Sequence, residues 1–128
     1  SRTKQKYKKD TDLNFRLTVN LRGRLNQAIK TNAKNGSAVR DLGCSIDFLR
    51  AYLESMFQPG MTWENYGSYW SIDHIIPCVT FDLTKEEEQK ICFNYKNLQP
   101  LWNEENSRKG NREMVQLENK EEKERNDG

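Results

Sequence analysis

Apolar residues recur at helical spacing over positions 13–29, and this pattern restricts the front of the chain to an amphipathic helix. Side chains three or four positions apart share one side of a helix, so we expect the apolar stripe to enter the core. Polar and basic residues fall on another side. The stripe consists of Leu13, Leu17, Leu21, Leu25, Ala28 and Ile29, and the polar side of Arg16, Asn20, Arg24, Gln27 and Lys30.

A second helix is predicted to begin at Ser45, whose hydroxyl is suited to cap the first free amides of a helix. Asp47 then lies in the first turn, where a negative charge is favourable, and Pro59-Gly60 ends the helix. Residues 32–43 are predicted to form a loop that turns at Asn35-Gly36. The buried side of this helix would consist of Ile46, Leu49, Leu53 and Met56 or Phe57.

Basic residues are concentrated in the front half of the chain. Residues 1–50 hold 12 Lys/Arg against 4 Asp/Glu, although the net charge of all 128 residues is only +2. Such a distribution is typical of proteins that bind a polyanion such as nucleic acid. For the basic side of the first helix, a DNA-contacting surface and a merely solvated surface are equally open. The length of 128 residues is typical of a single domain.

The aromatic and β-branched run over residues 70–76 predicts a short strand, which Pro77 stops. We expect Trp63, Trp70 and Trp102 to pack against the core, because a domain of this size needs their large apolar areas.

The connection after this strand contains a predicted helix. Thr84 and Glu87 have the spacing of a capping box, so a short helix should start there and continue to about residue 93. A return strand is expected over residues 95–102, and Asn103 is suited to cap a further helix. The predicted fold is therefore α+β and mainly helical: two helices, then a short β-hairpin that a helix follows.

Polar residues in the second half suggest a metal-dependent hydrolase. His74 is the sole histidine and follows Asp73 near the end of the first predicted strand. Histidine titrates near neutral pH, so it is well suited to take a proton from water. Asn97 and Asn106 follow, and Asn106 would lie in the first turn of the last helix, where free backbone amides favour a phosphate.

The run Trp70-Ser71-Ile72-Asp73-His74-Ile75-Ile76-Pro77, with Asn97-Leu98-Gln99-Pro100-Leu101-Trp102 and Asn106, resembles the HNH endonuclease family. Its ββα-metal fold is a hairpin with a helix closing over one divalent cation, and residues 70–110 would form it. The spacing from Asn97 to Asn106 and Lys109 is similar to that of the HNH domain in CRISPR guide-RNA effectors. The resemblance to small phage, viral and mobile-element HNH proteins covers about residues 12–112.

The resemblance implies a role for each of these residues. His74 would be the general base, and Asn97 would hold the loop and orient it. Asp73 and Asn106 would ligate one Mg²⁺ or Mn²⁺ ion, because hard cations prefer oxygen ligands. Lys109, one turn beyond Asn106, would contact the phosphate near the cut.

The implied activity is a DNA endonuclease that hydrolyses phosphodiester bonds with one metal ion. The cation stabilises the charge on the leaving side while the histidine activates water. A monomer would nick one strand, and a weak dimer or a second encounter would cut both. Two alternatives stay open: a DNA-binding module without turnover, and a structure-specific nuclease or ribonuclease. Double-stranded DNA would be held by Arg16, Arg22, Arg24, Lys30, Arg108 and Lys109.

Three departures from the family pattern concern the site, and the first is Asn106, where other members carry a histidine and which is a weaker, neutral oxygen ligand. Ser71 stands where related proteins often carry a histidine, and the chain lacks the cysteine pairs that hold zinc in many members. The cysteines are Cys44, Cys78 and Cys92, which are widely spaced. We expect buried thiols, with neither a disulfide nor a structural zinc.

The predicted organisation has three parts. Residues 1–11 form a basic flexible arm, residues 12–112 one HNH domain, and residues 113–128 a charged tail that is either a solvated helix or disordered. Within the domain, residues 12–58 would contact DNA and residues 70–110 would carry out catalysis. The chain lacks a secretory signal and a membrane-length apolar run, so an intracellular location is expected.

Overall fold

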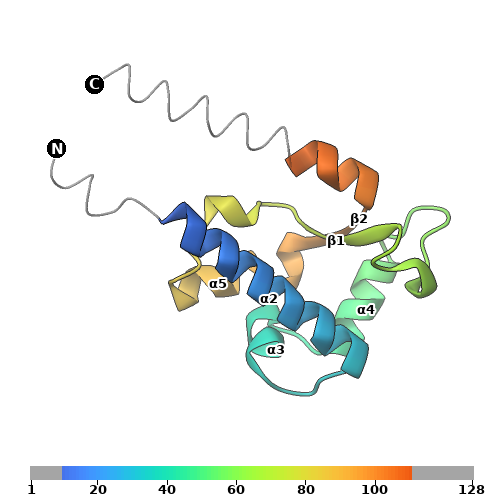
Figure 1. The fold of residues 1–128 in the computed structure, drawn as a ribbon. Helices are drawn as coiled ribbons and strands as arrows, with labels where there is room; N and C mark the ends of the chain where they lie inside the picture. The colour runs from blue at the N-terminus through green and yellow to red at the C-terminus, as the bar shows by residue number, and fades with distance from the viewer. Residues whose placement is uncertain (1–9, 111–128) are drawn as a thin grey trace, which may run out of the picture. The chain divides into compact units, whose positions relative to one another are not determined.

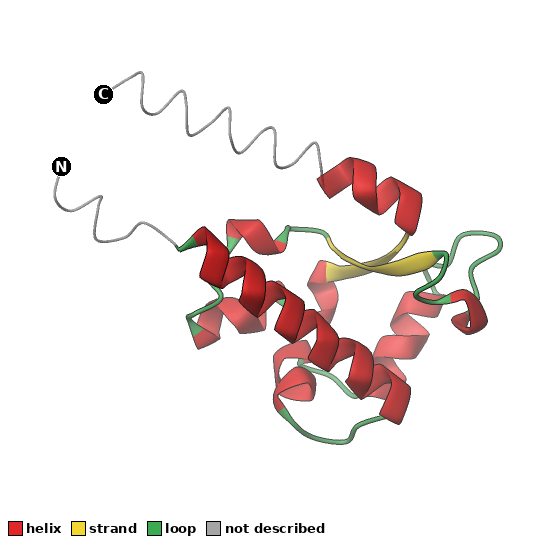
Figure 2. Cartoon of the chain, viewed as in Figure 1, coloured by secondary structure: helices red, strands yellow, loops and turns green. Residues whose placement is uncertain are grey.

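The computed structural model describes residues 10–110, which form an α+β structure of helices and one two-stranded antiparallel sheet (Figures 1 and 2). The described residues divide into two compact units. Unit 1 holds 10–56 and His74–Gln99, and unit 2 holds Phe57–Asp73 and 100–110. The predicted charged tail and all but the last two residues of the basic arm lie outside the described residues. None of the helices in 10–110 is both long and apolar enough to cross a bilayer.

Helix α2 spans Thr11–Thr31 and confirms the first predicted helix. Its start lies two residues earlier than expected, because the carboxylate of Asp10 accepts a hydrogen bond from the Leu13 amide at 3.0 Å and caps the helix. Asn32 ends it in the left-handed conformation, with φ of 51°. The predicted stripe is buried over its last four members, Leu21, Leu25, Ala28 and Ile29.

The predicted loop over residues 32–43 is wrong in its second half, where α3 spans Ser37–Leu42. A helix of six residues is unstable in isolation, so local sequence gives little sign of it. Tertiary packing stabilises it instead, because Leu42 is fully buried and α3 packs against both α2 and α5. Three α-helices, not two, therefore precede the sheet within the described part of the chain.

Helix α4 spans Ile46–Glu54 and begins at the predicted cap, where the Ser45 hydroxyl accepts from the Phe48 amide at 3.0 Å. Its buried residues are Ile46, Leu49 and Leu53, as the periodicity predicts. The helix ends well before Pro59-Gly60.

Aromatic side chains form the core of unit 2. The ring of Trp70 is fully buried and contacts Phe57, Trp63 and Tyr66, with ring centroids 4.8–5.3 Å apart. Its indole N–H donates to the Thr62 carbonyl at 2.7 Å, so the polar atom of the buried ring is satisfied. This packing confirms the predicted structural role of Trp63 and Trp70.

The two strands are shorter than predicted. Strand β1 spans Trp70–His74 and β2 spans Leu98–Trp102 (Figure 2). Ile75 and Ile76 lie outside β1 and are about half exposed, at 46% and 47%. The expected first residues of the return strand instead form the 3-10 helix η3, Tyr95–Asn97. Residues 103–110 are helical after β2, which gives the predicted order of strand, strand and helix.

The connection between the strands contains a 3-10 helix, η2 (Cys78–Thr80), and helix α5 (Glu86–Cys92). The predicted capping box is wrong: the Thr84 hydroxyl donates to the Asp82 carboxylate at 2.6 Å, and α5 starts without a side-chain cap. Asn14 of α2 holds this connection. Its buried amide accepts from the Leu83 amide at 2.8 Å and donates to the Cys78 carbonyl at 3.5 Å.

Candidate functional site

The carboxylate of Asp73 is a candidate ligand in unit 2. Its side chain is 8% exposed, and Oδ2 lies 2.6 Å from the ammonium of Lys109. A carboxylate removed from water at this depth is stabilised by a cation at such a short distance. The structure therefore brings together the first and the last residue of the predicted motif, which are 36 positions apart in the sequence.

The helix over residues 103–110 carries Asn106 and Lys109. Residues three positions apart share one side of a helix, so half-buried Asn106 lies one turn before the residue that contacts Asp73. The predicted cap at Asn103 is wrong, because its amide makes other bonds. It accepts from the Ser71 hydroxyl at 2.5 Å and donates to the Gly67 carbonyl at 3.1 Å. Ser71 thus joins β1 to the start of this helix.

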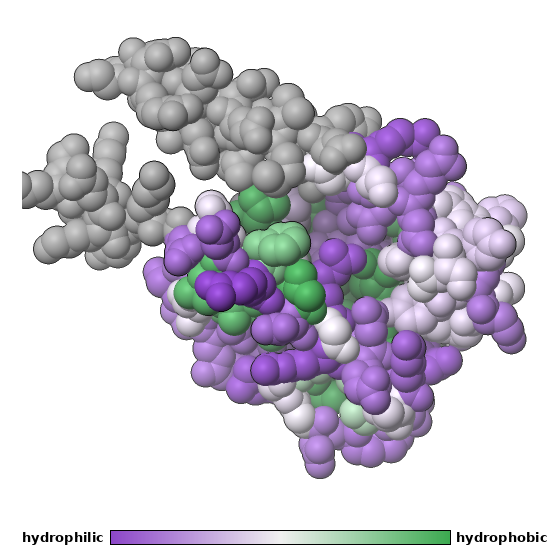
Figure 3. All heavy atoms as spheres, in the orientation of Figure 1, coloured by the Kyte–Doolittle hydropathy of each residue, from purple (hydrophilic) through white to green (hydrophobic). Residues whose placement is uncertain are grey.

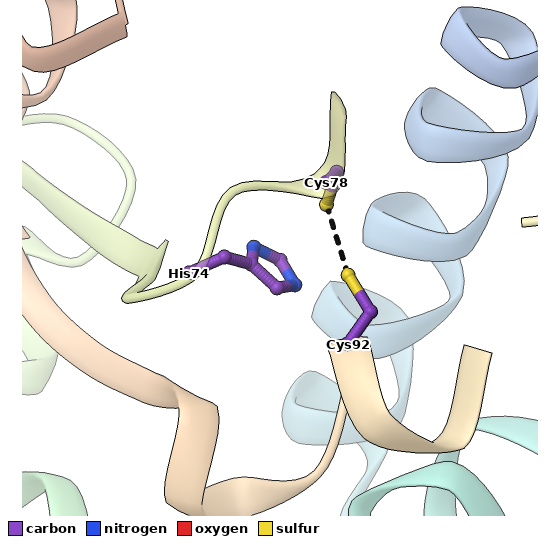
Figure 4. A group of neighbouring side chains, drawn as sticks. All are labelled: His74, Cys78 and Cys92. Carbon is purple, nitrogen blue, oxygen red and sulfur yellow. Dashed lines mark hydrogen bonds between the residues drawn. The ribbon is translucent and has the colours of Figure 1, made fainter. Parts of the chain in front are cut away.

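His74 lies in unit 1 and is 6% exposed. Its ring meets Phe93 edge-on, with centroids 4.5 Å apart. The ring points toward two buried cysteines that come from different elements, Cys78 at the start of η2 and Cys92 at the end of α5 (Figure 4). One nitrogen of His74 and the two sulfurs all lie within 4.8 Å of one another. We call these three residues the His–Cys–Cys cluster.

The two thiols of the His–Cys–Cys cluster interact strongly. The Cys92 thiol donates to the Cys78 sulfur at 3.4 Å. This hydrogen bond, with His74 nearby and the charge of Arg22, lowers the pKa of Cys78 to about 5. The same bond and burial raise the pKa of Cys92. The pair therefore favours one thiolate, at Cys78, and one thiol.

Asn97 clamps the segment that follows His74. Its carbonyl oxygen Oδ1 accepts from the Ile76 amide at 2.8 Å, and Nδ2 donates to the carbonyls of Ile76 at 3.0 Å and Cys92 at 2.8 Å. Its backbone carbonyl accepts from the Ile75 amide at 2.8 Å. One buried side chain therefore fixes both the loop after His74 and the end of α5.

The predicted DNA-binding residues on α2 are exposed, and hydrophilic side chains cover most of the face seen in Figure 3. Two apolar residues of the same helix, Phe15 and Val19, are also exposed, at 68% and 53%. Arg108 is exposed and pairs with Glu104 at 3.6 Å. The predicted DNA-binding residues on α2 are Arg16, Arg22, Arg24 and Lys30.

An open cavity of about 500 Å³ lies beside the clamped loop in unit 1. Its lining consists of two isoleucines, two lysines and two asparagines. The lining residues are Ile76, Lys90, Ile91, Asn94, Lys96 and Asn97.

Cys78 and Cys92 were not among the predicted site residues. Spacing provides only a weak signal, because His74 and Cys78 are four positions apart but Cys92 follows fourteen positions later. The burial of these cysteines agrees with the predicted buried thiols.

No family model and no solved structure matches the chain. Among the proteins that do match, Uncharacterized protein L426 of Acanthamoeba polyphaga mimivirus is 44% identical over 112 residues, 88% of this chain and 49% of that protein. Uncharacterized protein L246 of the same virus is 37% identical over 97 residues, 75% of this chain and 42% of that protein. The chain spans about half the length of these relatives or slightly less.

Proposed function

We propose that the chain is a divalent-metal-dependent endonuclease that hydrolyses phosphodiester bonds in DNA. The observation that carries this proposal is the contact of Lys109 with the buried carboxylate of Asp73 at 2.6 Å. It joins the strand end that bears Asp73-His74 to the helix that bears Asn106 and Lys109. The resemblance to HNH nucleases implies a site built from these residues.

The donor set of unit 2 suits Mg²⁺ or Mn²⁺. Asp73 offers a carboxylate and Asn106 an amide oxygen, and hard divalent cations prefer oxygen ligands. Two protein ligands leave positions for water and phosphate oxygens. When bound, the cation would stabilise the negative charge that develops on the leaving oxygen. The ammonium of Lys109 would then bind a phosphate oxygen near the cut.

His74 would take the proton of the attacking water. In the structure its ring is turned toward Cys78 and Cys92, so this role requires the ring to rotate toward the substrate (Figure 4). Asn97 would position His74 by fixing the backbone of the two residues that follow it. A general base of this kind contributes about 10²–10⁴-fold to the rate.

The exposed basic residues of α2 are proposed to hold the DNA backbone. Phosphate contacts give salt-dependent affinity without base specificity, so a double-stranded substrate of any sequence should bind. A single site cuts one strand, and a monomer should nick. The charge of α2 is tested by Arg16→Gln with Arg24→Gln, which should flatten the salt dependence of binding by about one unit of slope per lost contact. An unchanged slope would assign these arginines to a solvated face.

Supercoiled plasmid tests the activity. The full chain should convert it to the nicked form with Mg²⁺ or Mn²⁺ and leave it supercoiled with a chelator. Asp73→Asn should require more Mg²⁺ for half-maximal nicking, whereas Asp47→Asn, a change at an exposed carboxylate, should not. Intact plasmid with both metals over neutral to alkaline pH would refute the nuclease and favour a DNA-binding module. Faster cleavage of an RNA of equal length would assign a ribonuclease.

A further inference from the structure

The His–Cys–Cys cluster has the composition of a site for a soft or borderline cation. A buried imidazole and two buried sulfurs from three segments of unit 1 converge within 4.8 Å. Nitrogen and sulfur ligands suit Zn²⁺, whereas they suit Mg²⁺ and Mn²⁺ poorly. The cluster is therefore chemically distinct from the oxygen ligands proposed for the nuclease metal.

The separations in the cluster are close to those of a zinc site. Two sulfurs at about 2.3 Å from a tetrahedral zinc lie about 3.8 Å apart, and the sulfurs of Cys78 and Cys92 are 3.4 Å apart. The remaining ligand separations do not exceed 4.8 Å. Small side-chain shifts, on the order of an ångström, would bring all three atoms onto one ion.

The backbone that carries the cluster is already held in place. Asn97 bonds both the loop between His74 and Cys78 and the carbonyl of Cys92. Asn14 donates to the carbonyl of Cys78. These bonds hold the backbone of the segments that carry the three side chains, in the way that outer hydrogen-bond partners hold the ligands of metal sites.

We propose that His74, Cys78 and Cys92 bind one Zn²⁺ ion and that the bound ion holds His74 away from catalysis. Zinc binding deprotonates whichever thiols still carry a proton, and these protons leave to solvent. Three protein ligands leave a fourth position for water. Because a nitrogen that ligates zinc cannot accept a proton from water, zinc would inhibit the nuclease. This inhibition rests on the proposed function, whereas the zinc binding does not.

Cobalt titration tests binding without an activity assay. The metal-free full chain, kept reduced, should develop the near-ultraviolet band of thiolate-bound Co²⁺ and saturate at one ion per chain, and Zn²⁺ should abolish the band. Cys78→Ser and Cys92→Ser should lose the band. Cys44→Ser, which changes the half-buried cysteine outside the cluster, should keep it. No band in the unmodified chain, or equal loss in Cys44→Ser, would overturn the site.

A second measurement covers the case in which a cluster variant does not fold. X-ray absorption at the zinc edge of the unmodified protein should give two sulfur neighbours and one imidazole nitrogen. A first shell of oxygen and nitrogen alone would overturn the assignment.

The inhibitory role is tested by adding Zn²⁺ to Mg²⁺-supported nicking, with each variant compared with its own zinc-free rate. The unmodified chain should lose activity over the zinc range that displaces cobalt, and Cys78→Ser should resist. Equal inhibition of both proteins would overturn this role. A chain that binds cobalt but never nicks DNA would refute the nuclease and leave the zinc site standing.

Discussion

Asp73 and His74 are joined by one peptide bond, yet their side chains belong to clusters of opposite chemistry. Asp73 contacts the ammonium of Lys109 within unit 2, and His74 lies among sulfurs within unit 1. Both residues belong to β1, and successive side chains of a strand point to opposite sides. One dipeptide at a strand end therefore contributes a carboxylate to an ion pair with Lys109 and an imidazole to a group with two cysteine sulfurs.

The largest effect on the rate of nicking is expected when the His–Cys–Cys cluster loses its imidazole. His74→Ala should slow nicking by about 10²–10⁴-fold, because it removes the proposed general base. DNA affinity, measured separately by fluorescence anisotropy, should stay the same. If nicking persists at the full rate, His74 has no catalytic role and belongs to the His–Cys–Cys cluster alone. The cluster and the Asp73–Lys109 pair would then act independently.

The next largest effect is expected at the contact between Asp73 and Lys109. Lys109→Met keeps most of the length of the side chain and removes its ammonium, so nicking should fall by about 10²-fold through loss of the charge proposed to bind the phosphate. Added Mg²⁺ should also raise the melting temperature of this variant more than that of the unmodified chain, because the cation replaces the lost charge beside Asp73. Lys85→Met, at an exposed lysine, is the control. Equal rates for the two variants would reduce the Asp73–Lys109 contact to a structural ion pair.

Asn97, which holds the backbone around the His–Cys–Cys cluster, should contribute to the free energy of unfolding. Asn97→Ala removes three hydrogen bonds to buried or partly buried backbone, so urea denaturation should show a loss of about 2–4 kcal/mol. Asn94→Ala is a matched control, because among residues 10–110 the side chain of Asn94 accepts one hydrogen bond, from the Lys96 N–H, and its loss should cost about 1 kcal/mol. Similar losses for both variants would show that Asn97 is not a clamp.

Ser71, which joins β1 to the helix that carries Lys109, should contribute less to the free energy of unfolding. Ser71→Ala removes one hydroxyl bond to Asn103, so we expect about 1 kcal/mol in the same experiment. Ser68→Ala, at an exposed serine, should cost less than about 0.5 kcal/mol. If Ser71→Ala loses as much unfolding free energy as Asn97→Ala, the hydrogen bonds of Asn97 are not the stronger of the two sets.

Sequence patterns predicted the elements that local rules determine. Periodicity identified α2 and α4, and the cap at Ser45 identified the start of α4, because these signals act within a few residues. The cap at Asp10 was not predicted. Helix α3 was missed because its stability comes from packing against α2 and α5. The capping box at Thr84 failed because Asp82, two residues earlier, competes for the hydroxyl.

The candidate site also has a part that the sequence predicted and a part that it did not. The resemblance implied that the elements of Asp73 and Lys109 meet, and it assigned Asn97 to the loop that it clamps. The His–Cys–Cys cluster could not be predicted, since Cys92 reaches it only through the fold of the whole connection. The spacing of His74 and Cys78 is only a weak signal of the cluster, and the position of Cys92 fourteen residues later gives no sign of that approach.

The two buried asparagines also bear on how the protein opens. Asn14 and Asn97 accept from the amides of Leu83 and Ile76, both at 2.8 Å, in a connection that has no strand of its own. Amide hydrogen exchange depends on whether such bonds break, so these two protons should exchange as slowly as those of buried helices. An irregular segment would then belong to the last part of the protein to unfold.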